Sequence, residues 1–264
     1  MGDAMANDPP TPALRLDLAL VVRGLAPSRA AAQRLIEAGL VRSGERVLAR
    51  AAATIPAGAP LTVTGEAHPW VSRGGVKLAH ALDGFAIPVE GRVGLDVGAS
   101  TGGFTDVLLR RGAARVVAVD VGHGQMAAAL REDPRVTCHE HLNARDIDPA
   151  TTEGPVDLIV CDVSFIGLRV ALPAALALAA PGAHLVALIK PQFEVGRANV
   201  GKGGIVRDRA LHARACATIG DWLAAQPGWR VLGLLDSPIE GGDGNREFLI
   251  AAEFGQRAGT VWGE

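Results

Sequence analysis

A short, mostly apolar run followed by a glycine-rich turn limits the fold more than any other feature of this 264-residue chain. Residues 93 to 97 are typical of a buried strand, and glycines follow at positions 98, 102 and 103. Glycine permits a tight turn into the helical pattern of residues 104 to 111, and it lets the backbone approach a ligand closely. The sequence therefore predicts a strand, a ligand-binding turn and a helix.

The acidic residues beside this turn indicate what it binds. The glycine spacing differs from the G-x-G-x-x-G dinucleotide fingerprint, and the turn lacks the lysine of a P-loop. Asp96 ends the first strand and Asp120 ends the next, where a carboxylate can bind ribose hydroxyls. An acid in the turn suits a cationic ligand, so the pair suggests S-adenosylmethionine. The alternative is an ordinary βα turn whose glycines serve packing alone.

From residue 91 onward, strands alternate with helices. Strands are predicted at 93–97, 115–120, 135–138, 156–161, 184–189 and 230–235. Such alternation is typical of a mostly parallel sheet with helices on both faces. Pro181-Gly182 divides the long apolar stretch, which therefore predicts a helix over 170–180, a turn and a strand rather than a membrane span.

Lysine is rare, which draws attention to its positions. Of the 26 basic residues only three are lysines, Lys77, Lys190 and Lys202. Because arginine does not lose its proton, lysine is expected where a titratable amine is needed. Lys190 ends a buried strand, which is costly unless the amine has partners or a task. Lys202, in a glycine-rich segment, is either an RNA contact or simply exposed.

The N-terminal quarter differs from the rest. Residues 1 to 13 are expected to be disordered, with no signal peptide. Helices are predicted at 14–22 and 29–38, the second capped by Ser28 and Gly39, before short strands up to residue 63.

This N-terminal region is locally basic. Residues 14 to 66 hold seven arginines against four acidic residues, although the whole chain has a net charge of −2. Arg15 on the first helix and Arg29 and Arg34 on the second form either an RNA-binding face or a merely solvated one. The region has no aromatic residue, so a folded RNA, recognised by shape and phosphates, is the expected partner.

Residues 14 to 64 resemble the small RNA-binding domain first known from ribosomal protein S4, and the later motifs resemble the FtsJ-type ribose methyltransferases. Together, the chain after residue 13 resembles the TlyA family, often labelled hemolysin A. The motifs that carry the resemblance are Arg15-Leu-Asp17, Gly24-Leu-Ala-Pro-Ser-Arg29, Trp70-Val-Ser-Arg-Gly74, Asp96-Val-Gly-Ala-Ser-Thr-Gly-Gly-Phe-Thr105, Asp162-Val-Ser-Phe-Ile166, Lys190-Pro-Gln-Phe-Glu194 and Gly244-Asn-Arg-Glu247.

The resemblance implies an α/β fold with a Rossmann-like class I methyltransferase domain, which has a mostly parallel sheet and helices on both faces. This domain is expected at residues 73–255, after a small α+β RNA-binding domain at 14–66 and a linker at 67–72. Residues 256–264 are expected to form a tail.

The resemblance also implies a catalytic tetrad of Lys77, Asp162, Lys190 and Glu247, with Glu240 as a nearby rival to Glu247. Lys190 is the expected base for the 2′-hydroxyl. Lysine is mostly protonated at neutral pH, so burial and the charge of Lys77 would have to favour the neutral amine, while the two carboxylates would oppose this.

The remaining expected site residues form two sets. The expected cofactor contacts are Asp96, Gly98, Ala99, Ser100, Gly102, Gly103, Phe104, Asp120, Asn143 and Asp162, and the expected RNA contacts are Arg15, Arg29, Arg34 and Arg73.

The implied activity is S-adenosylmethionine-dependent 2′-O-methylation of ribosomal RNA, at cytidine in the 16S RNA, the 23S RNA or both, within ribosomal subunits. We expect a cytoplasmic enzyme with no metal, no membrane association and no obligate protein partner. One alternative is a membrane-active hemolysin, which the divided apolar stretch argues against. The other is a non-catalytic RNA-binding protein with a vestigial methyltransferase fold, which the intact tetrad argues against.

Overall fold

The computed structural model describes residues 13–56, 58–64, 68–241 and 244–255. The chain divides into two compact units, Met1–Arg73 and Gly74–Glu264. Of the N-terminus predicted to be disordered, only Ala13 lies within the described residues, and the predicted tail lies wholly outside them.

The first unit packs two helices on short strands. Helix α1 (Leu16–Val22) is followed by α2 (Arg29–Glu37), which Ser28 caps by accepting a hydrogen bond from the Ala31 N–H at 3.2 Å. The strands form two antiparallel sheets, one pairing β1 (Leu14–Arg15) with β4 (Thr54–Ile55), the other ordered β3 (Arg46–Val47), β2 (Val41–Ser43), β5 (Thr62–Val63). The expectation that Arg15 lies on the first helix was wrong, because its extended backbone pairs with Thr54 and only then enters α1.

A buried carboxylate ties these helices together. Asp17 in α1 is fully buried and accepts hydrogen bonds from Arg15 at 3.0 Å, Arg29 at 2.8 Å and Gln33 at 3.3 Å. The two guanidinium groups hold the pKa of the Asp17 carboxyl well below its usual range. Arg15 and Arg29 are thereby fixed in place, while about half of each side chain remains exposed.

We expect Asp17→Asn to destabilise the first unit, because two guanidinium ions lose their anionic partner. A lowered pKa means that the folded protein releases this proton more readily than the unfolded chain does. The stabilisation is therefore present above about pH 4 and is lost as the pH falls further. Opening free energies of α1 and α2 from amide hydrogen exchange should be smaller in the variant at pH 7 and should depend less on pH. Equal opening free energies at pH 7 would contradict this.

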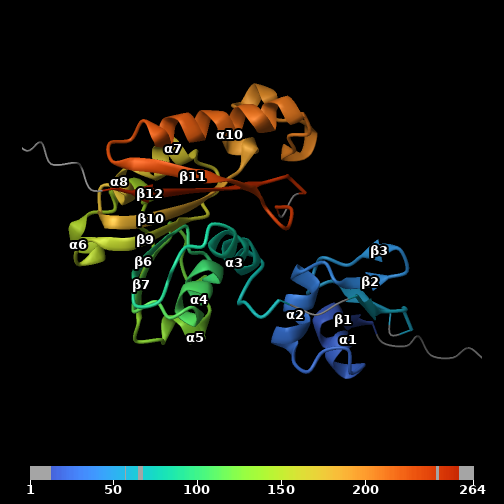
Figure 1. Cartoon of the computed structure of the whole chain (residues 1–264). Helices are drawn as coiled ribbons and strands as arrows, with labels where there is room; N and C mark the ends of the chain where they lie inside the picture. Colours follow the sequence, from blue (N-terminus) through green and yellow to red (C-terminus); the bar gives the residue numbers. More distant parts are fainter. Residues whose placement is uncertain (1–12, 57, 65–67, 242–243, 256–264) are drawn as a thin grey trace, which may run out of the picture. The chain divides into compact units, whose positions relative to one another are not determined.

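The second unit is built on a seven-stranded sheet in the order β11-β12-β10-β9-β6-β7-β8 (Figure 1). Adjacent strands among β10, β9, β6, β7 and β8 are parallel, whereas β12 is antiparallel to both of its neighbours. The mostly parallel sheet of the sequence prediction is confirmed. The strands are β6 (Val93–Val97), β7 (Arg115–Val119), β8 (Val136–His139), β9 (Val156–Cys161), β10 (Ala179–Ile189), β11 (Trp229–Asp236) and β12 (Phe248–Phe254).

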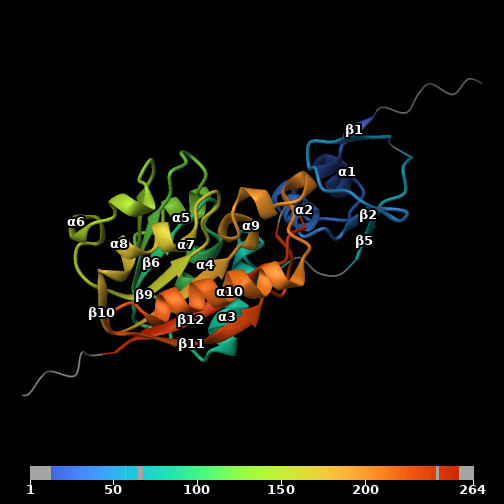
Figure 2. The ribbon, with the colours of Figure 1, turned by 90° about the horizontal axis from the view of Figure 1, so that it is seen from above.

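Helices cover both faces of this sheet, as Figures 1 and 2 show. One face carries α3 (Gly74–Gly84), α4 (Gly103–Arg110) and α5 (Ala128–Arg131), and the other carries α7 (Leu168–Ala171), α8 (Pro173–Leu176) and α10 (Arg209–Ala224). The connections hold η1 (Ala144–Asp146), α6 (Pro149–Thr152), α9 (Pro191–Glu194), η2 (Arg197–Asn199) and η3 (Lys202–Gly204).

Three elements of this unit differ from the sequence prediction. The helix expected over 170–180 is interrupted at Pro173, which lacks the N–H that a helix interior requires and instead begins α8. Strand β10 already begins at Ala179, and its register shifts before His184, around Pro181-Gly182. Strand β12 was not predicted, although its apolar run Leu249–Ala252 is fully buried.

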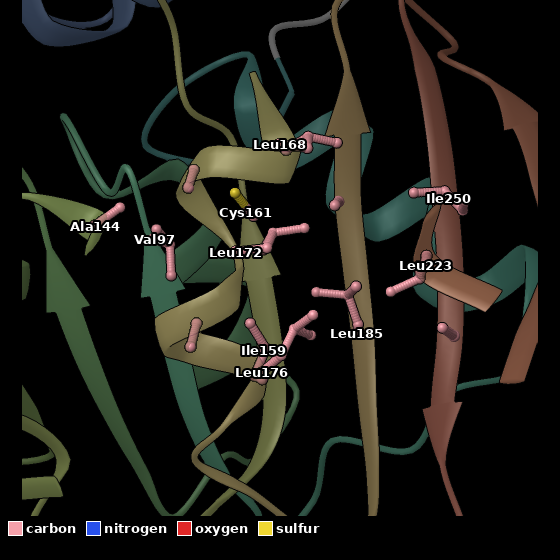
Figure 3. Packing of buried hydrophobic residues seen from close by; sticks show 14 of the residues in the cluster. Val97, Ala144, Ile159, Cys161, Leu168, Leu172, Leu176, Leu185, Leu223 and Ile250 are labelled. Atoms are coloured by element: carbon pink, nitrogen blue, oxygen red, sulfur yellow. The ribbon is translucent and has the colours of Figure 1, made fainter. Parts of the chain in front are cut away.

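The core lies between the sheet and the α7, α8 and α10 layer (Figure 3). Leu172, Leu176 and Leu223 from the helices pack against Ile159 and Leu185 of the sheet. This packing fixes the strand ends on which the site is built. Within the described part of the chain, no helix has both the length and the apolar character needed to cross a membrane.

Candidate functional site

The site lies at the carboxyl ends of the parallel strands. Asp162 directly follows β9 and Lys190 directly follows β10. Strand β12 begins at the same edge, because Phe248 pairs with Ile189. Glu247, one residue before β12, therefore lies opposite Lys190, one residue after β10. The fold thus gathers three predicted tetrad residues from three separate parts of the sequence.

These residues form two ion pairs, and the lysine of each pair is buried. Lys190 Nζ lies 2.6 Å from Asp162 Oδ1 and donates a hydrogen bond to Ser164 Oγ at 2.8 Å. Lys77, on α3, donates to Glu247 Oε2 at 2.5 Å. Both lysines are more than nine-tenths buried, so each ammonium needs its carboxylate. Glu247 is buried as well, whereas its rival Glu240 is exposed.

A cavity of about 450 Å³ adjoins the Lys190 pair, a volume within the range of small-molecule sites. Asp162 and Ser164, which both contact Lys190, belong to its wall. Five of the expected cofactor contacts line the cavity, namely Gly98, Ser100, Asp120, Asn143 and Asp162.

The other five, Asp96, Ala99, Gly102, Gly103 and Phe104, do not line it. Asp96 is fully buried, and its Oδ2 accepts hydrogen bonds from the N–H and the hydroxyl of Thr105 at 2.9 and 2.7 Å. Phe104 is buried, and a Cβ on Gly102 would collide with Leu130. These residues shape the turn between β6 and α4 from within the protein.

The wall that faces the cavity is held rigidly by hydrogen bonds. Asp120 accepts from the backbone N–H of Ser100 at 2.8 Å and of Gly122 at 2.6 Å, which fixes its carboxylate. The Ser100 hydroxyl donates to Gln125 Oε1 at 3.0 Å. Gln125 was missed from the sequence, since it follows its strand without any recognisable motif.

These residues fit S-adenosylmethionine. Asp120 has the position of a ribose-binding carboxylate, and Asp162 adds a second negative charge for a cationic ligand. Leu142, Val163 and Ile166 supply an apolar wall for a ring system. Gly98 has φ +85°, and a Cβ there would lie 2.8 Å from the Asp162 carbonyl oxygen. The turn can therefore lie this close to Asp162 only with glycine at position 98.

Phe165 is the most exposed large apolar side chain beside the cavity. It is 92% exposed, lies on the cavity wall and has φ +67°, which is rare for a residue with a Cβ. Its ring centroid is 5.3 Å from that of Phe193. The motif Asp162–Ile166 contained Phe165, but only the structure shows that the ring faces outward.

The expected RNA contacts of the first unit gather in two places. Arg15 and Arg29 share Asp17. The charges of Arg34 and Arg73 both reach Glu37 and His68. Burial raises the pKa of the Glu37 carboxyl, and the two arginines partly offset this rise. Burial, and to a smaller extent the same two arginines, lowers the pKa of the His68 imidazole. Each pair therefore concentrates positive charge on one part of the unit.

Gly98→Ala should weaken binding of S-adenosylmethionine at least tenfold, since the new methyl group would displace Asp162 from the cavity wall. Gly182→Ala is the matched control, because Gly182 has φ +82° but no atom within 4 Å of the point where a Cβ would lie, so it shares only the backbone strain. Calorimetric titration of both variants measures the effect. Equal losses of affinity would show that strain, and not the contact with Asp162, is responsible.

Asp96→Asn should change how stability depends on pH. Burial raises the pKa of the Asp96 carboxyl to about 7, and its Oδ1 has no hydrogen-bond partner. The folded protein thus retains a proton that the unfolded chain releases near pH 4, so this group lowers stability as the pH rises from 4 to 7. Between pH 4 and pH 7, the free energy of unfolding of the variant should therefore rise relative to that of the unsubstituted protein, by a few kcal/mol at most. Denaturant unfolding at several pH values measures this, and parallel pH profiles would contradict it.

Comparisons with known proteins agree with this architecture. The family model of the FtsJ-like methyltransferase matches residues 70–254, and that of the S4 domain matches residues 14–59. The 16S/23S rRNA (cytidine-2′-O)-methyltransferase TlyA of Mycobacterium tuberculosis H37Rv is 50% identical over 237 residues, which cover 89% of this chain and 88% of the relative. Hemolysin A of Brachyspira hyodysenteriae is 40% identical and covers 89% of this chain and 98% of its own.

Solved structures give the same result. A Streptococcus thermophilus protein described as a hemolysin superposes with a TM-score of 0.73 at 42% identity, covering 93% of this chain and 90% of its own. The sequence prediction of the family is confirmed. With an S4 domain followed by an FtsJ-like methyltransferase domain, and half of its residues identical to a TlyA enzyme over most of its length, the chain belongs to the TlyA family.

Proposed function

We propose that this protein is an S-adenosylmethionine-dependent 2′-O-methyltransferase that acts on cytidine of ribosomal RNA, in the 16S RNA, the 23S RNA or both. The observation that supports this most is the ion pair between the buried Lys190 and Asp162, which lines the 450 Å³ cavity. An amine that can accept a proton thus adjoins a space that suits a cationic methyl donor. The activity named for the Mycobacterium tuberculosis relative agrees with this chemistry.

S-adenosylmethionine, when bound, supplies a methyl group on a positively charged sulfur. Asp120 would accept hydrogen bonds from the ribose hydroxyls of this cofactor, since its carboxylate is fixed at the wall by two backbone N–H groups. The ring system of the cofactor would pack on Leu142, Val163 and Ile166. These residues would hold the cofactor in the cavity whose wall includes Asp162 and Ser164, the two residues that contact Lys190.

Lys190 accepts the proton of the 2′-hydroxyl on the RNA ribose that is to be methylated. In this structure its amine donates to Ser164 and pairs with Asp162, so it must release a proton before it can act as a base. Asp162 then stabilises the ammonium that forms, and Glu247 compensates Lys77 beside it.

RNA is held by aromatic and basic groups. Phe165 offers an exposed ring at the cavity wall on which a base can stack, as unpaired RNA bases do on aromatic side chains. Arg15, Arg29, Arg34 and Arg73 bind phosphates of folded RNA in the subunit. A substrate of this kind places the protein in the cytoplasm.

Lys190→Ala and Lys190→Arg should both lower methyl transfer at least a hundredfold, the usual worth of a general base. Arginine retains the positive charge but cannot lose its proton, so this variant distinguishes a role of Lys190 as proton acceptor from a role as positive charge. The measurement is transfer of labelled methyl from S-adenosylmethionine to separated, unmodified small and large ribosomal subunits.

Lys202→Arg is the matched control, because it makes the same replacement at the exposed third lysine. Lys190→Arg with normal turnover would contradict the assigned role of Lys190. RNA binding without methyl transfer to either subunit by the unsubstituted protein would favour a non-catalytic RNA-binding protein.

A further inference from the structure

A second cavity, of about 360 Å³, lies between α10 and the ends of β11 and β12. Its volume also suits a small ligand. No step of the proposed reaction uses it. Its lining residues are Arg209, His212, Ala213, Cys216, Leu234, Leu235, Asp236, Arg246 and Phe248.

This cavity lies next to the tetrad, across the sheet. Side chains alternate between the two faces of a strand, and the ladder extends past β12 because the Ser237 N–H donates to the Glu247 carbonyl. Glu247 reaches Lys77 of α3 on one face. Arg246 and Phe248 lie on the α10 face, where the Phe248 ring packs edge-on against His212. A polymeric ligand that crosses this edge of the sheet can therefore reach both the tetrad and the cavity.

The cavity carries a positive charge that is not neutralised. Arg246 pairs with Asp236 at 2.9 Å, and its guanidinium lies 5.5 Å from the centre of the Phe248 ring. Within the described chain, the Arg209 side chain has no hydrogen-bond or ion-pair partner. The Cys216 thiol remains neutral, because burial raises its pKa to about 11. Arg209 is therefore the group at which an anion can bind.

His212 adds an unpartnered acceptor to this wall. It is more than nine-tenths buried, and its Nε2 lies 2.8 Å from the Val206 carbonyl oxygen. A carbonyl can only accept, so Nε2 carries the hydrogen and Nδ1 presents a lone pair. Nδ1 is buried and has no partner. A buried acceptor of this kind calls for a donor that the protein does not supply.

We propose that this cavity binds one nucleotide of the substrate RNA, close in sequence to the nucleotide whose ribose reaches Lys190. Arg209 binds its phosphate, and the base enters between Ala213 and Phe248, beside the unpartnered His212. This assignment rests on the proposed function, because it is the RNA chain at the tetrad that continues into the cavity.

Arg209→Ala tests the assignment against Arg214→Ala, which removes an exposed arginine of the same helix that does not line the cavity. Loss of one phosphate contact should reduce the slope of log affinity against log salt by about 1. We expect this change for ribosomal subunits with Arg209→Ala and not with Arg214→Ala. Ala213→Trp, which fills the cavity, should raise KM for the subunit at least fivefold while S-adenosylmethionine affinity is unchanged.

A photoreactive amino acid at Leu234 gives a readout that does not depend on catalysis. Leu234 lines the cavity and is 44% exposed. It should cross-link to a nucleotide within a few positions of the methylated one, and the same group at Arg214 should not. Failure of the unsubstituted protein to methylate either subunit would overturn the proposed function. Normal methylation with equal effects of the two arginine variants, and no cross-link from Leu234, would overturn the cavity assignment alone.

Discussion

Two lysines buried beside two carboxylates are the constraint on which this methyltransferase unit depends. A buried ammonium without a counter-charge would cost several kcal/mol, so Lys77 and Lys190 are tolerated only where Glu247 and Asp162 meet them. Those carboxylates come from far along the sequence, and only the sheet order β12-β10-β9 brings them to one edge. The packing of α7, α8 and α10 on the sheet therefore serves the chemistry, because it fixes the register that aligns Glu247 with Lys190.

Asp162 links this charge arrangement to the cavity. Its backbone N–H donates to the Val97 carbonyl at 3.0 Å, its own carbonyl faces Gly98, and its carboxylate holds Lys190. A group bound in the cavity thus acts on the lysine through one residue. Placing the cofactor wall and the base on the same short segment limits how far either can move without the other. This coupling explains why a positive-φ glycine stands directly after β6.

Much of this could be predicted from the sequence, because local rules govern it. Ser28 caps its helix and the apolar runs form strands, and the resemblance to the FtsJ-type motifs identified the four charged residues that pair. The features that could not be predicted are tertiary in origin. Asp96 and Phe104 belong to the right motif, yet their side chains point inward, which the one-dimensional pattern does not encode. Strand β12 was not predicted, because the motif directly before it was interpreted only for its chemistry. Gln125 and His212 can be recognised only from their surroundings in the folded structure.

The central claim, that Lys190 accepts the proton, can be measured directly because the chain has only three lysines. Nuclear magnetic resonance of protein labelled at lysine Cε and Nζ should give three resolvable signals, assigned by Lys77→Arg, Lys190→Arg and Lys202→Arg. With S-adenosylmethionine bound, the Lys190 signal should titrate with the same midpoint as the rate of methyl transfer. A Lys190 signal that stays in the ammonium form throughout the pH range in which the enzyme turns over would contradict the account.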